Sequence, residues 1–105
     1  MNKILQVIEK VNTTIKTTYD NFNGLYLYGS CAAKKNNENS DIDIVAIFDK
    51  SLSREQRLYL WNLIGKIEVD FGVVLDLHPM SEAELKQNPI YYNQVVNKGI
   101  FYGAR

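Results

Sequence analysis

The chain has 105 residues, of which 46% are apolar and 23% charged, and its formal net charge is zero. A chain of this length buries one core, so we expect a single domain over residues 1–105. The balance of charges excludes a global field that would attract nucleic acid or an anionic membrane. No apolar run approaches the ~20 residues of a membrane span. The single cysteine excludes an internal disulfide and suits a reducing compartment, so we expect a cytoplasmic protein.

The first 40 residues are expected to contain a helix and a strand. Apolar residues recur at helical spacing over residues 4–20, which predicts an amphipathic helix with Asn2 as a possible cap at its start. Residues 21–24 have the composition of a turn, and residues 25–28 form a short strand. After this strand, residues 31–35 can form a helical turn, and residues 36–40 form a polar loop.

A strand and a capped helix are expected next. The segment 42–48 is almost continuously apolar, which predicts a strand that is covered on both faces. Ser53 can cap the following helix, with Gln56 in the position that completes a capping box. Gly72 is expected to end this helix. Four apolar residues are predicted to form its buried face: Leu58, Trp61, Ile64 and Ile67.

The last part of the chain is expected to contain a strand followed by short helices. Residues 73–77 form an apolar run with one acid, which predicts a buried strand. Ser81 can cap a short helix, with a glutamate three residues later. Residues 89–98 form a further helical segment, and residues 100–102 can form a terminal strand. This order of elements predicts an α/β fold, with a mixed sheet and helices packed against it.

Three aspartates are placed to form a metal site. Residues i and i+2 of a strand project from the same face, so Asp41 and Asp43 point together. Asp76 lies in the next apolar run, where a lone acid is costly to bury unless it is paired or bound to a metal. A crossover helix between the two strands can bring the three acids together. Carboxylate oxygens select hard cations such as Mg²⁺; the alternative for the first two acids is a strand start that faces water.

Gly29 and Ser30 stand ten residues before this acidic pair and can form a phosphate-binding turn. Glycine lets the backbone approach a bulky anion, and the Ser30 hydroxyl can donate to a phosphate oxygen. If residues 31–35 are helical, their free N–H groups also favour an anion. The alternative is a turn that only ends the strand.

In combination, Gly29-Ser30, the acidic pair Asp41 and Asp43, and the later strand acid Asp76 resemble the minimal nucleotidyltransferases (MNT proteins) of the DNA polymerase β superfamily. The resemblance covers nearly the whole chain and implies a polymerase-β-like nucleotidyltransferase fold. It implies that the glycine and serine bind nucleotide phosphates and that the three acids hold one or two Mg²⁺ ions. The implied reaction is in-line attack of a hydroxyl on the α-phosphorus of ATP, with release of pyrophosphate.

The chain differs from the family just after the Gly-Ser dipeptide. Family members usually carry arginines at positions that correspond to Cys31 and Ala33 in this sequence. The nearest cations are Lys34 and Lys35, which are the candidates to bind the triphosphate in place of those arginines. The other possibilities are that a partner supplies the cation or that nucleotide binding is weak.

The resemblance also implies a protein partner. One domain of this size has room for a nucleotide site and little else, so the acceptor must belong to another polypeptide. Stand-alone minimal nucleotidyltransferases resemble antitoxins that are paired with helical HEPN proteins and can silence them by adenylylating a tyrosine. The first hypothesis is therefore Mg²⁺-dependent transfer of AMP to a HEPN-type partner. The second is a binding module that neutralises its partner without catalysis, and a third is an aminoglycoside-type transferase that acts as a dimer.

Several other side chains have alternative roles. His78 would face the same way as Asp76 on a strand, where it can contact a phosphate or the acceptor, or it is a strand-end histidine at the surface. Cys31 has no neighbouring base in sequence and is expected to pack the turn. Tyr26 and Tyr28 are expected in the core or in a cleft wall. The aromatic residues near the C-terminus are assigned mainly to the core: Tyr91, Tyr92, Phe101 and Tyr102.

Overall fold

The computed structural model describes residues 2–29, 32 and 41–104. The predictions for Ser30, Cys31, Lys34, Lys35 and the loop at 36–40 lie outside the described residues.

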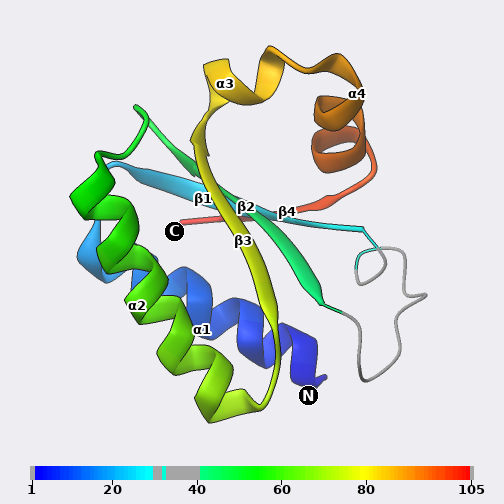
Figure 1. Ribbon diagram of the computed structural model, residues 1–105. Helices are drawn as coiled ribbons and strands as arrows, with labels where there is room; N and C mark the ends of the chain where they lie inside the picture. Colours follow the sequence, from blue (N-terminus) through cyan, green and yellow to red (C-terminus); the bar gives the residue numbers. More distant parts are fainter. Residues whose placement is uncertain (1, 30–31, 33–40, 105) are drawn as a thin grey trace.

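The chain folds into a four-stranded sheet with helices on both faces (Figure 1). The strand order is β3-β2-β1-β4; β2 and β3 are parallel, and the two other pairs are antiparallel. This is the mixed sheet that the sequence predicts. In chain order the elements are α1 (Lys3–Thr18), β1 (Phe22–Tyr28), β2 (Ile42–Phe48), α2 (Arg54–Phe71), β3 (Leu75–Ser81), α3 (Glu82–Lys86), α4 (Pro89–Tyr92), the π-helical turn η1 (Asn93–Asn97) and β4 (Ile100–Gly103).

Each face of the sheet has its own core. α1 and α2 pack on one face, where their apolar side chains meet alternate residues of the strands. α3, α4 and η1 cover the other face (Figure 1). The smaller core there is built around Val45, Ile47, Leu85 and Val95. β2 is consequently buried on both sides, as its apolar sequence predicts.

The predicted helix caps are confirmed. The Asn2 side chain accepts a hydrogen bond of 2.8 Å from the Ile4 amide at the start of α1. Ser53 and Gln56 form a capping box at the start of α2, with hydrogen bonds of 2.9 and 3.1 Å. Gly72 ends α2 in the left-handed conformation, with φ of 64°. These caps fix where both long helices begin and where α2 ends.

The predicted buried face of α2 is wrong in part. Ile64 and Ile67 are buried as expected, but Leu58 and Trp61 are each 48% exposed. Leu60 is fully buried in their place. α2 has apolar residues on more than one of its faces. The face that contains Leu60 is the one that docks on the sheet.

Two strands are longer than predicted. β1 begins at Phe22 instead of residue 25, because the residues expected to form a turn enter the sheet through a β-bulge, with Gly24 at φ of 145°. β3 begins at Leu75 and continues through Pro79 to Ser81. β3 is an edge strand, and a proline is tolerated there because it has no N–H to pair. None of the helices in the described part of the chain is long and apolar enough to cross a membrane.

Candidate functional site

Three polar side chains form a row across the sheet. Tyr28 of β1 lies opposite Asp43 of β2, and Asp43 lies opposite Asp76 of β3. Residues in direct register on neighbouring strands project from the same face, so the three side chains stand side by side. The predicted meeting of Asp43 and Asp76 through a crossover helix is therefore observed, with α2 as the crossover.

The row lies at one end of the strands. Tyr28 is the last residue of β1, whereas Asp43 and Asp76 are each the second residue of their strands. The row faces the side of the sheet that α3, α4 and η1 cover, because Asp43 lies two residues before Val45 on β2 and so shares its face. Asp43 is partly buried, and the side chain of Asp76 is half-exposed. Solvent and solutes can thus reach the acids from the edge strand.

The pKa of Asp43 is raised by its surroundings. Burial raises the pKa of its carboxyl, and the negative charges of Asp76 and then Asp41 raise the pKa further. A side-chain hydrogen bond to Asp76 acts in the same direction. Asp41 is exposed, yet it is close enough for its charge to act on Asp43. All three predicted acids contribute to one region of negative potential, which a cation would stabilise.

Gly29 lies directly against this region. Its φ of 75° is in the left-handed range, and a Cβ built at this position would overlap Oδ2 of Asp43. Only glycine therefore brings the turn this close to the carboxylate without displacing it. The binding of phosphate by the Gly-Ser turn stays a prediction.

His78 contacts the third acid. Its Nε2 lies 3.0 Å from Oδ1 of Asp76, and both side chains are 50% exposed. The prediction that the two side chains face the same way is confirmed. Of the alternative, a strand-end histidine at the surface, the exposure is observed, but His78 is not at the strand end because β3 continues to Ser81.

A second tyrosine, Tyr91, contacts Tyr28 at the end of the row, and sequence reasoning missed this pair. The hydroxyls of Tyr28 and Tyr91 lie 2.8 Å apart, and their rings make an edge-to-face contact with centroids 5.7 Å apart. Burial is the main cause that raises the pKa of both tyrosines, and the charges of Asp43 and Asp76 add to it. The position of Tyr28 next to Gly29 is the only sequence signal, because Tyr91 arrives here through the docking of α4.

The comparison with protein families identifies the fold. The family model described as "Polymerase beta, Nucleotidyltransferase" matches residues 9–100. The chain belongs to this nucleotidyltransferase family. The predicted resemblance and fold are confirmed, whereas no curated protein matches the chain in sequence.

Solved structures share this nucleotidyltransferase fold. A mutant of the toxin-antitoxin complex MntA-HpeT is 22% identical, with a TM-score of 0.66 over 96% of this chain and 72% of that one. A toxin-antitoxin structure with AMP-PNP is 24% identical, with a TM-score of 0.63 over 99% and 71%. A structure of tri-AMPylated Shewanella oneidensis HEPN toxin in complex with MNT antitoxin is 23% identical. Its TM-score is 0.55 over 92% of this chain and 70% of that one. At these identities the likeness establishes the fold.

The acids of this nucleotidyltransferase fit Mg²⁺ that arrives with a nucleotide. Among the described residues, no group of three or more His, Cys, Asp or Glu is arranged as a complete metal site. Mg²⁺ does not need such a cage, because it is usually held by one or two carboxylates together with water and substrate phosphates. Asp43 and Asp76 supply adjacent carboxylates, and the charge of Asp76 adds to burial in raising the pKa of Asp43, an effect that a bound cation would offset. The donor set and its electrostatics therefore fit the ion.

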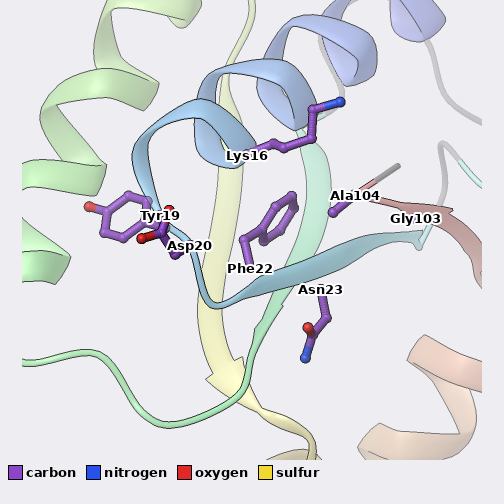
Figure 2. Close-up of a pocket in the computed structure, with 7 residues that line it drawn as sticks. All are labelled: Lys16, Tyr19, Asp20, Phe22, Asn23, Gly103 and Ala104. Atoms are coloured by element: carbon purple, nitrogen blue, oxygen red, sulfur yellow. The ribbon is translucent and has the colours of Figure 1, made fainter.

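A separate cavity lies at the other end of β1. Its volume is about 540 Å³, and it opens between the end of α1, the start of β1 and the end of β4 (Figure 2). The lining residues are Lys16, Tyr19, Asp20, Phe22, Asn23, Gly103 and Ala104. The Tyr19 hydroxyl already donates to the Gln56 carbonyl at 2.7 Å, which joins α1 to α2. None of the predicted site residues lines this cavity, so it forms no part of the nucleotidyltransferase site.

Proposed function

We propose that this protein is a Mg²⁺-dependent nucleotidyltransferase that moves AMP from ATP to a hydroxyl of a protein partner. The partner is a HEPN-type toxin, for which this chain is the antitoxin. The observation that carries the proposal is the placement of Gly29 against Asp43, with Asp76 in register on the next strand. The family match supports the reaction class, and the AMP-PNP and AMPylated-toxin structures with the same fold support the nucleotide and the partner.

Each acid has a distinct place in this proposal. Asp41, Asp43 and Asp76 would hold the metal, which supplies neutralisation of the triphosphate and activation of the attacking oxygen when it is bound. Asp43 is the central member, since the other two charges both act on it. Asp76 is half-exposed on the edge strand, so it is the acid that an acceptor hydroxyl from another protein can approach. It is also the candidate to take the proton from that hydroxyl.

The phosphate side of the proposal rests on the turn after β1. Gly29 lies at the edge of the acidic region, where the phosphates of a metal-bound nucleotide would lie. Ser30, Lys34 and Lys35 are proposed to complete phosphate binding, as the sequence predicts. The reaction requires ATP and Mg²⁺, which are both abundant in the cytoplasm, and we propose that compartment and a single domain over residues 1–105.

The test is transfer of label from α-labelled ATP to the purified HEPN partner in the presence of Mg²⁺. We expect label on the partner with the unaltered chain, and loss of label with Asp43→Asn and with Asp76→Asn. Asp20→Asn is the matched control, because this acid is exposed and lines the cavity at the other end of β1. The competing proposal is a binding module, favoured by Cys31 and Ala33 in place of arginines. The binding-module proposal predicts that the unaltered chain neutralises the toxin fully without transferring label to it. It also predicts that Asp43→Asn and Asp76→Asn neutralise the toxin equally well.

A further inference from the structure

Asp76 stands where a carboxylate is hard to keep in one orientation. β3 is an edge strand, so Asp76 has a neighbouring strand on one side only. Its side chain is half-exposed. An exposed aspartate can exchange among staggered rotamers, and each exchange turns its oxygens away from a bound ion. A productive site therefore needs a second group that holds this side chain.

The structure supplies that group in His78. The two residues are two positions apart on β3 and project from the same face. Their side chains lean together until Nε2 of His78 lies 3.0 Å from Oδ1 of Asp76. On the neighbouring strand, Asp43 lies opposite Asp76 in register. The Asp76 carboxylate therefore has the central acid as its neighbour across the sheet and the histidine as its contact along β3.

We propose that His78 is a positioning residue that fixes the Asp76 carboxylate for a divalent cation. This inference rests on the proposed nucleotidyltransferase site. A hydrogen bond from an imidazole N–H to one oxygen of a ligating carboxylate sets the direction of the remaining lone pairs. Groups that hold metal ligands in this way typically change metal affinity or activity by about 10- to 100-fold when they are removed.

The competing interpretation is an ordinary surface ion pair. The structure contains one for comparison on α3, where Nζ of Lys86 lies 2.8 Å from Oε1 of Glu82. Such exposed pairs contribute little to stability, and removing one has no reason to alter a distant site. A measurement at the acids therefore separates the two interpretations, whereas a measurement of stability does not.

The experiment measures binding of Mn²⁺, as a probe for Mg²⁺, by electron paramagnetic resonance of the free ion. His78→Leu removes the N–H donor, and His78→Gln keeps a side-chain amide that can donate to Asp76. We expect Mn²⁺ binding about 10-fold weaker in the leucine variant and close to the unaltered chain in the glutamine variant. Lys86→Leu is the matched control and should bind Mn²⁺ like the unaltered chain. In the transfer assay, His78→Leu should lower kcat more than it raises KM for ATP.

Equal Mn²⁺ affinity in the unaltered chain and in His78→Leu would overturn the inference and leave the proposed function intact. Weaker binding in His78→Leu without any AMP transfer to the partner would contradict the proposed function and support the positioning role. Binding that is also unchanged in Asp43→Asn and Asp76→Asn would place the ion elsewhere and overturn both.

Discussion

The hydroxyl of Tyr28 lies 2.8 Å from the hydroxyl of Tyr91, and this contact ties α4 to the end of the strand that leads to Gly29. Tyr28 also lies opposite Asp43, so the pair connects α4 to the acids. The position of Tyr28 beside the site therefore depends on the docking of α4.

Replacing Tyr91 by phenylalanine should destabilise the fold by about 1 kcal/mol, because the hydroxyl of Tyr28 loses its partner while it stays partly buried. The measurement is the free energy of unfolding in urea. The double variant Tyr28→Phe/Tyr91→Phe removes both hydroxyls, so its loss should be smaller than the sum of the two single losses. Additive losses would show that the two hydroxyls do not depend on each other.

Gly29→Ala and Gly72→Ala form a matched pair. Both glycines have φ in the left-handed range, at 75° and 64°, so each alanine should cost about 1–2 kcal/mol of folding free energy. A Cβ at Gly72 would meet open space, whereas a Cβ at Gly29 would overlap Asp43. Only Gly29→Ala should therefore also weaken Mn²⁺ binding and AMP transfer. An equal effect of both substitutions on Mn²⁺ binding would contradict a role of Gly29 in the site.

Asp43→Asn should stabilise the metal-free protein at neutral pH. Burial and the neighbouring acids raise the pKa of Asp43 in the folded state, so the folded protein loses stability as pH rises through and above the ordinary aspartate range. Asparagine removes this penalty. The gain should be present at pH 7, disappear near pH 3 and shrink at pH 7 when Mn²⁺ stabilises the unaltered chain. Thermal unfolding at the two pH values, with and without Mn²⁺, checks this; a variant less stable than the parent at pH 7 without metal contradicts it.

Leu60→Ala and Leu58→Ala test which face of α2 is buried. Leu60 is fully buried, so its truncation should cost about 2–5 kcal/mol. Leu58 is 48% exposed, and its truncation should change stability by less than about 0.5 kcal/mol. Unfolding in urea gives both values. A larger loss of stability for Leu58→Ala than for Leu60→Ala would show that the face predicted from sequence periodicity is the buried one.

The elements that sequence reasoning predicts well are those with local causes. The capping box at Ser53, the left-handed Gly72 and the apolar run of β2 each depend on neighbouring residues alone. The wrong predictions all depend on distant contacts. Pro79 is part of a strand because β3 is at the edge of the sheet, and Leu60 is buried because α2 docks through that side.

The candidate site likewise contains some features that the sequence predicts and others that depend on distant contacts. Asp41 and Asp43 are two residues apart, so strand geometry places them together, and the crossover that brings Asp76 beside them follows from a parallel strand pair. The contacts of Tyr91 and His78 are different, because they depend on the docking of α4 and on how two side chains lean. The two-residue spacing predicts that His78 and Asp76 share a face, but no spacing in the sequence encodes the contact itself or the contact of Tyr91. They emerge only when the layers of the fold are assembled.

The parallel pairing of β2 with β3 also sets the order in which the site forms. β1 and β2 are neighbours along the chain, so Gly29 and Asp43 can meet early in folding. Asp76 joins them only after the chain has passed through the whole of α2, and such long-range closure is slow. A partly synthesised or partly unfolded chain therefore lacks its third acid. The proposed transfer activity would therefore require a completed core, and a chain that lacks the β2–β3 pairing would have no complete acidic site.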